Sequence, residues 1–262
     1  MIYNQTRLKM PLLKRVHYLD TKKGYPLVLV HGFLGSNDLW KYQIREFRKK
    51  FRVIGIELPG YGKNVKAKPL SSIHGYVNYV LKILNSLKIK EFYLIGHSMG
   101  GMIAQEIAAK SKKIKKVILH ATGPIGEMPE RFEPLKVSRM KLRKNGIKKQ
   151  GKFIASTWFV KGAKHKNFNI CKRSYERVLL KTADLSMLAM QKWNGKKNLK
   201  KIKIPTLITW GNKDKSYGRP QVNTLKKQIK NSRLMVFNNC AHNVHLEKVK
   251  DFNRSVLHFL GS

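Results

Sequence analysis

The chain has 262 residues, 42% of them hydrophobic, which is enough to bury the core of one large domain or two small ones. Its 55 Lys and Arg against 14 Asp and Glu give a formal charge of +41, yet lysine outnumbers arginine 42 to 13 and the basic residues are spread over nearly every segment. No zinc-finger, KH or RNP-type aromatic motif accompanies this charge, so we interpret it mainly as compositional bias and do not expect a nucleic-acid-binding function.

Short apolar runs alternate with amphipathic stretches over the first 121 residues. This pattern is typical of a mostly parallel sheet covered by helices on both faces, so it predicts a doubly wound α/β fold. The expected strands are 16–19, which is antiparallel, and then 26–30, 52–57, 92–95 and 114–119. The expected helices are 40–49, capped by Asn37 or Asp38, and then 73–87 and 102–109.

The regular pattern stops between residues 122 and 200, where only helical segments with scattered prolines and glycines occur. We interpret this stretch as a helical cap inserted into an α/β core formed by residues 1–121 and 201–262. Within it, residues 136–175 contain thirteen Lys or Arg and no Asp or Glu. The sheet pattern then returns with expected strands at 205–210 and 233–237 and expected helices at 221–229 and 251–260.

The motif Gly96-His97-Ser98-Met99-Gly100 lies between an apolar strand and a helix. This is the context of a nucleophile elbow, a sharp turn that exposes a serine hydroxyl and needs small neighbours so that the strand and helix can approach. The turn also aims the first amides of the helix at the reacting carbonyl oxygen. Ser98 is therefore the candidate nucleophile.

A serine nucleophile needs a histidine base and a carboxylate that orients it. Asp214 directly follows the strand 205–210, and His242 follows the last strand, so both lie where the carboxyl ends of parallel strands converge. His245 is the competing base, but we favour His242. We expect His97 to be a packing residue and Glu247 to anchor the histidine loop.

Together these motifs resemble the α/β-hydrolase family along nearly the whole chain. The segment His31-Gly32-Phe33-Leu34-Gly35 resembles its oxyanion loop, and Leu58-Pro59-Gly60-Tyr61-Gly62 resembles the loop after the next strand. The resemblance implies an α/β-hydrolase fold and an oxyanion hole formed by the backbone amides of Phe33 and Met99. The sequence departs from the family pattern at Glu57, Asn64 and Ala241, where aspartate, serine and glycine are usual.

The constellation implies acyl transfer to water through an acyl-enzyme, without a metal or an organic cofactor. Dehalogenases and epoxide hydrolases of this fold carry an aspartate at the position of Ser98, which excludes them. Carbon–carbon bond hydrolases stay as an alternative, although they usually carry tryptophan where this chain has Asn243. Carboxylic ester hydrolysis is the simplest prediction. The expected substrate-binding residues are Gly32 and the cap residues Trp158, Phe159 and Met187. These cap residues either line an acyl or alcohol pocket or merely pack the cap against the core.

The basic cap suggests a sharper hypothesis about partners: a small anionic ester, or an acidic carrier protein that bears the ester. A nonenzymatic binder of anionic ligands or nucleic acid is the remote alternative. The sequence has no apolar run as long as a membrane span, and Cys171 and Cys240 lack metal-ligand or disulfide-framework spacing. We therefore expect a cytoplasmic protein with reduced cysteines.

Overall fold

One seven-stranded sheet organises the computed structural model, which describes residues 16–261. The strand order is β1-β3-β2-β4-β5-β6-β7, with β1 antiparallel to β3 and every other neighbouring pair parallel. The mostly parallel sheet is therefore confirmed. The strands are β1 Tyr18–Asp20, β2 Tyr25–Val30, β3 Phe51–Ile56, β4 Phe92–His97, β5 Ile114–His120, β6 Thr206–Gly211 and β7 Ser232–Phe237.

The apolar runs are buried on both faces of the sheet because successive side chains of a strand point to opposite sides. In β2, Leu27 and Leu29 join one hydrophobic cluster, which includes Phe252, whereas Val28 and Val30 join the other. These four side chains of β2 are fully buried. This alternation explains why the strands read as continuous apolar segments in the sequence.

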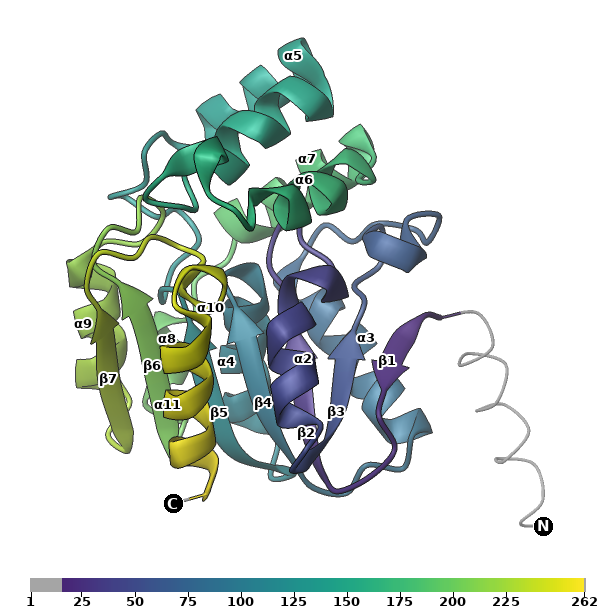
Figure 1. Ribbon diagram of the computed structural model, residues 1–262, viewed down its shortest axis with the longest axis vertical. Helices are drawn as coiled ribbons and strands as arrows, with labels where there is room; N and C mark the ends of the chain where they lie inside the picture. The colour runs from purple at the N-terminus through teal and green to yellow at the C-terminus, as the bar shows by residue number, and fades with distance from the viewer. Residues whose placement is uncertain (1–15, 262) are drawn as a thin grey trace.

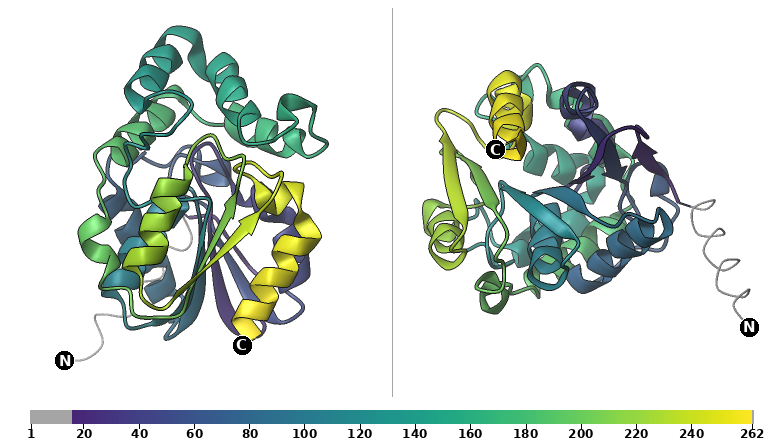
Figure 2. Two further views of the ribbon diagram at one scale, coloured as in Figure 1. Left: turned by 90° about the vertical axis from the view of Figure 1, so that its left-hand side faces the viewer. Right: turned by 90° about the horizontal axis from the view of Figure 1, so that it is seen from below.

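Helices cover both faces, as Figure 1 and the side view of Figure 2 show. The helices α2 (Lys41–Phe47) and α11 (Val249–Gly261) contact each other on one face. The other face carries α3 (Ile73–Ser86), α4 (Met99–Lys110), α8 (Lys196–Leu199) and α9 (Arg219–Gln228). The doubly wound architecture therefore follows the prediction.

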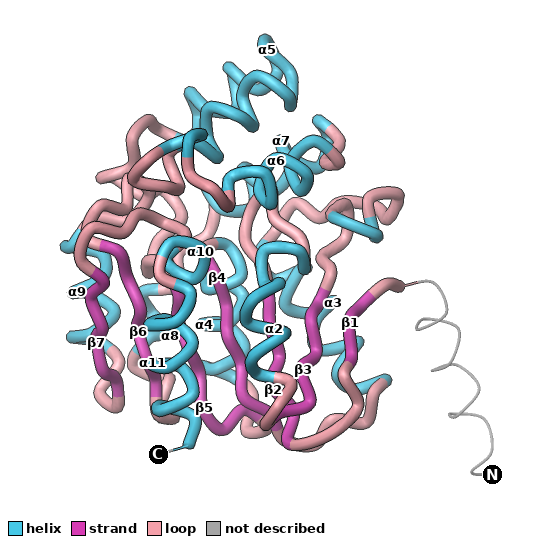
Figure 3. The backbone as a smooth tube through the Cα atoms, in the orientation of Figure 1, coloured by secondary structure: helices cyan, strands magenta, loops and turns pink. Residues whose placement is uncertain are grey.

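The segment after β5 forms helices that lie beyond the carboxyl ends of the strands (Figure 1). They are α5 (Leu135–Ser156), α6 (Phe168–Glu176) and α7 (Leu180–Gln191), and α5 is kinked at Gly146. The loops that leave the carboxyl ends of the strands gather between these helices and the sheet (Figure 3). We propose that residues 122–200 act as a cap over these loops.

Local details differ from the sequence expectations. Short helical turns occur at η1 Asn37–Trp40, η2 Gly62–Asn64, η3 Gly162–Lys164 and α10 Val244–Glu247. The cap predicted for the helix 40–49, Asn37 or Asp38, is wrong, since α2 begins after Trp40 without a side-chain cap. The preceding turn η1 is capped by Ser36, whose side chain accepts a hydrogen bond from the Asp38 N–H. Helix α4 begins at Met99, three residues before the prediction, because the turn at Ser98 leads directly into it. No helix within residues 16–261 is both long enough and apolar enough to span a bilayer.

Candidate active site

Ser98 occupies a strained turn between β4 and α4. Its backbone has φ 54° and ψ −116°, a left-handed conformation that costs free energy for any residue other than glycine. The Ser98 N–H donates to the carbonyl of His120 at 2.9 Å, and the Thr122 hydroxyl donates to the Ser98 carbonyl at 2.9 Å. The turn is therefore held from the neighbouring strand β5.

Two glycines allow β4 and α4 to meet at this turn. A Cβ on Gly96 would collide with the Gly100 carbonyl, and a Cβ on Gly100 would collide with the carbonyl of Val30 in β2. Both obstacles are backbone atoms, which cannot rotate away as a side chain can. The Gly-x-Ser-x-Gly spacing is thus a packing requirement of the strand-to-helix turn.

Asp214 and His242 come together from the loops that follow β6 and β7. The Asp214 Oδ2 atom accepts a hydrogen bond from His242 Nδ1 at 2.9 Å, and both side chains are almost completely buried. Asp214 Oδ1 accepts from the N–H of Ser216 at 2.7 Å and of Tyr217 at 3.4 Å. The carboxylate is therefore fixed, and it holds His242 in the tautomer whose Nε2 is free to accept a proton.

Glu247 anchors the histidine loop, as predicted, and also ties it to the segment after α5. Its carboxylate accepts hydrogen bonds from the Ala241 N–H at 2.6 Å and from the Val160 N–H at 2.8 Å. Burial raises the pKa of Glu247, and these two bonds oppose the rise. Substitution of the usual glycine by Ala241 is compatible with this loop because the contact uses its backbone.

Three further imidazoles pack behind the candidate base. The ring centroids of His97 and His242 are 4.8 Å apart, and His120 Nε2 and His245 Nδ1 are hydrogen bonded at 2.9 Å. The donor atoms of His97, His120 and His245 lie within 4.8 Å of one another, so these described residues have the composition to hold a metal ion. Burial keeps the pKa of each well below its ordinary value. We interpret the group as neutral rings that pack on one another, with His97 in contact with His242.

The loop after β2 brings the predicted oxyanion residues to the elbow. A Cβ on Gly32 would lie 2.9 Å from the Ser98 Cβ, so only glycine allows this approach. The His31 Nδ1–H donates to the Gly32 carbonyl at 2.9 Å, and burial lowers the pKa of His31 to about 4. Among the described residues, the N–H groups of Phe33 and Met99 make no turn or cap hydrogen bond, which leaves them available to a ligand.

A cavity of about 20 Å³, roughly the space for one water molecule, lies at Ser98 and His242. Arg131 and Ser216 contribute polar atoms to its wall. Its apolar lining consists of Phe33, Met128, Leu135, Ile154, Trp158 and Met190. A cavity of this size has to widen before it can hold an ester.

Of the four predicted substrate-binding residues, only Trp158 lines the cavity, and Gly32 lies beside Ser98 without lining it. Trp158 lines the cavity, and its ring centroid lies 6.1 Å from that of His242. Phe159 is instead stacked on His165, with ring centroids 4.6 Å apart, and Met187 is fully buried in the hydrophobic core. Neither of these two lines the cavity.

Two residues near Ser98 were not identified from the sequence. Tyr217 is stacked on His242 with an interplanar angle of 18°, and its buried hydroxyl has no hydrogen-bond partner among residues 16–261. Burial raises the pKa of Tyr217, which keeps the phenol protonated, and the hydroxyl of Ser98 is near enough to oppose that rise. The second residue that the sequence analysis did not identify is Arg131, which lines the cavity. Tyr217 and Arg131 both follow the carboxyl end of a strand, and this position is the signal that could have found them.

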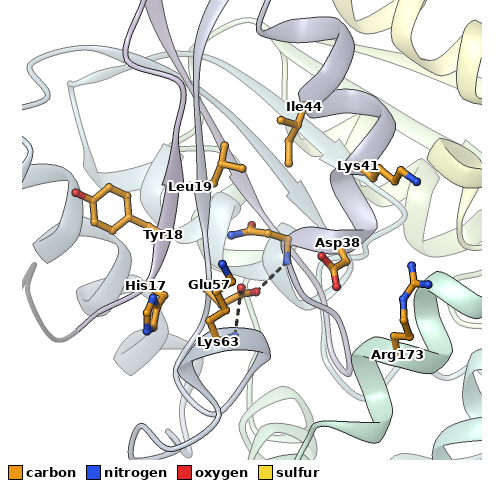
Figure 4. Close-up of a pocket in the computed structure, with 10 residues that line it drawn as sticks. His17, Tyr18, Leu19, Asp38, Lys41, Ile44, Glu57, Lys63 and Arg173 are labelled. Atoms are coloured by element: carbon orange, nitrogen blue, oxygen red, sulfur yellow. Dashed lines mark hydrogen bonds between the residues drawn. The ribbon is translucent and has the colours of Figure 1, made fainter.

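A second pocket lies away from Ser98 (Figure 4). It has a volume of about 630 Å³ and is bordered by β1, the start of α2 and Arg173 of α6. Glu57 lies within it and accepts hydrogen bonds from the N–H groups of Asn37 and Lys63. This pocket is lined neither by Ser98, Asp214 and His242 nor by Phe33 and Met99, so the small cavity at Ser98 is the candidate site.

Comparisons with known proteins identify relatives of the same fold. A family model described as the alpha/beta hydrolase fold matches residues 25–144. The AB hydrolase superfamily protein YisY of Bacillus subtilis is 26% identical, over 93% of this chain and 94% of the relative. A 2-hydroxy-6-oxononadienedioate/2-hydroxy-6-oxononatrienedioate hydrolase of Cupriavidus pinatubonensis is 27% identical, over 95% and 91%. The crystal structure of an enol-lactonase from Burkholderia xenovorans superposes with a TM-score of 0.85 at 20% identity, covering 94% of this chain and 96% of the enol-lactonase.

Proposed function

Since the chain belongs to the α/β-hydrolase fold family, we propose that it is a serine hydrolase that cleaves carboxylic esters through an acyl-enzyme. Ser98 is the nucleophile, His242 the general base and Asp214 the carboxylate that orients His242. The observation that carries the proposal is the strained backbone of Ser98 beside a cavity that it shares with His242, whose Nδ1 is bonded to Asp214 at 2.9 Å.

In the proposed reaction, His242 Nε2 accepts the Ser98 proton while the serine oxygen attacks the ester carbonyl. The resulting oxyanion accepts hydrogen bonds from the amides of Phe33 and Met99. His242 then gives its proton to the leaving alcohol, and the acyl-enzyme forms. Water, deprotonated by the same histidine, attacks the acyl group and restores Ser98.

The small size of the cavity sets a condition on this sequence of steps. The cavity holds about one water, so an ester requires the wall formed by Leu135, Ile154 and Trp158 to move outward. We expect the Ser98 hydroxyl to hydrogen bond to His242 Nε2 as the substrate binds, because catalytic hydrogen bonds are often long before the substrate is present.

Hydrolysis of p-nitrophenyl esters of graded chain length tests the proposal. We expect wild type to release p-nitrophenol and Ser98→Ala to lose activity by several orders of magnitude, while Ser255→Ala on α11 keeps it. A fluorophosphonate probe should label wild type and Ser255→Ala but not Ser98→Ala. Absence of labelling in the folded wild type would overturn the assignment of the nucleophile.

Carbon–carbon bond hydrolysis stays a second candidate. It is favoured by the similarity to the hydrolase of 2-hydroxy-6-oxononadienedioate, which extends over 95% of this chain. Against it stands Asn243, at the position where tryptophan is usual in that class. Fluorophosphonate labelling together with inactivity on every ester, and turnover of a vinylogous 1,5-diketone, would select this candidate instead.

A further inference from the structure

The cavity at Ser98 contains one cation in an otherwise mostly apolar wall. Among the described residues, Arg131 is the only lysine or arginine that lines it. The thirteen basic residues between 136 and 175, which suggested an anionic partner from the sequence, are absent from the lining. Positive charge at the reaction centre thus comes from the loop after β5.

Arg131 is held in place by contacts that use only part of its guanidinium group. Its Nη1 donates to the Glu133 carbonyl at 2.5 Å and to the Ser138 hydroxyl at 2.8 Å, and the group lies 4.0 Å from the centroid of the Phe132 ring. Among the described residues, Nε and Nη2 form no hydrogen bond. The side chain is therefore oriented but keeps donors available.

Within residues 16–261, no carboxylate forms an ion pair with Arg131. The Glu133 carboxylate accepts hydrogen bonds from Ser138 at 2.5 Å, Lys141 at 2.6 Å and Gln150 at 3.1 Å. Its hydrogen-bonded link to Arg131 runs through the Ser138 hydroxyl. By contrast, the buried Asp20 pairs directly with Arg52 at 2.8 Å. Arg131 is thus a partly buried cation without a direct counterion.

A charge in an apolar wall costs free energy unless an opposite charge compensates it. Burial lowers the pKa of Arg131 to about 10, and the charge of Glu133 opposes this change, so the group stays protonated at neutral pH. A carboxylate on the substrate would supply the missing counterion and could accept two parallel hydrogen bonds from the free edge of the guanidinium.

We propose that Arg131 binds an ionised carboxylate of the substrate, so that the preferred substrates are esters that carry a second, anionic group. This inference rests on the proposed ester hydrolysis and names its substrate class. The group could lie on the acyl side, as in a dicarboxylic acid monoester, or on the alcohol side, and Arg131 recognises the same chemistry in both.

The test compares p-nitrophenyl hemiglutarate with p-nitrophenyl pentanoate, which has the same number of acyl carbons and no charge. We expect wild type to favour the glutarate ester in kcat/KM, and Arg131→Gln to reduce the ratio of the two values by about tenfold to a hundredfold. Arg131→Lys should retain part of the preference. Arg143→Gln, which removes one charge from an exposed arginine of α5, is the matched control and should keep the wild-type ratio.

The alcohol side is tested with the same variants, using 4-acetoxybenzoate against phenyl acetate. A preference that disappears in Arg131→Gln for this pair alone would place the carboxylate on the leaving group. Ratios that are equal in wild type and Arg131→Gln for both pairs would overturn the proposal. So would an equal change of the ratios in Arg143→Gln, since the effect would then come from overall charge.

Binding to an inactive variant separates this proposal from the proposed function. Glutarate should raise the melting temperature of Ser98→Ala but not that of the double variant Ser98→Ala/Arg131→Gln. This shift does not depend on turnover, so it would be seen even if no ester were hydrolysed. Equal shifts in the two variants, or none in either, would refute the role of Arg131 and leave the triad assignment untouched.

Discussion

Replacing Asp214 by asparagine removes the charge opposite His242 while keeping the size of the side chain. Asp214 Oδ2 lies 2.9 Å from His242 Nδ1, and both side chains are buried. When His242 takes the Ser98 proton it becomes a cation, and at an effective dielectric constant of about 20 its attraction to the carboxylate is on the order of 5 kcal/mol. Because about 1.4 kcal/mol corresponds to a factor of ten, we expect kcat/KM to fall by roughly three to four orders of magnitude.

The assay is hydrolysis of p-nitrophenyl butyrate, with Ser98→Ala as the floor. Asp251→Asn is the matched control, because Asp251 is half-exposed on α11 and pairs only with Arg254 in the described structure. The asparagine carbonyl at position 214 can still accept from the Ser216 N–H, so we expect a melting temperature near that of wild type. A loss of less than tenfold in a folded Asp214→Asn variant would refute the reasoning, since another group would then have to stabilise the His242 cation.

Three further predictions concern the supports of the site. In Gly96→Ala the new methyl group collides with the Gly100 carbonyl, so fluorophosphonate labelling should be lost; wild-type labelling would contradict this. Tyr217→Phe removes a buried hydroxyl that has no partner among the described residues. We expect the free energy of unfolding to rise by about 1 kcal/mol, which calorimetry would detect as a melting temperature a few degrees higher. A lower melting temperature would show that the hydroxyl is hydrogen bonded. The pKa of His31 is about 4 in the folded protein, below the unfolded value of about 6.5. Between these two pH values the unfolded chain therefore binds more protons than the folded protein. As the pH drops from 6.5 toward 4, the free energy of unfolding should fall, on the order of 3 kcal/mol for His31 alone. Buried His97 acts in the same direction, and a melting temperature independent of pH over this range would contradict both.

Much of the fold could be predicted because burial on both faces of a parallel strand leaves a direct trace in the sequence. The expected helix 73–87 is α3, one residue shorter, and the expected strand 233–237 is β7, one residue longer. The cap predicted for the helix 40–49, Asn37 or Asp38, is wrong because the turn η1, which was not expected, precedes α2. Ser36 caps this turn, and α2 begins after Trp40 without a side-chain cap.

The wall of the cavity could not be predicted in the same way. Trp158 and Phe159 are adjacent aromatic residues of similar burial, yet Trp158 faces His242 and Phe159 faces His165. In the sequence, Arg131 differs from the thirteen basic residues that follow it only in lying nearer to the carboxyl end of a strand. What distinguishes Arg131 is the position of its side chain relative to Ser98, which depends on contacts with Phe132 and Ser138.

The amino-acid sequence alone predicts the α/β class, the turn at Ser98 and the order in which Asp214 and His242 follow it. These features depend on local backbone requirements and on the period of apolar residues, and both can be read along the chain. The small size of the cavity and the presence of Arg131 in its wall emerge only in three dimensions, because segments distant in sequence form that wall by side-chain packing, and packing has no counterpart in a linear pattern.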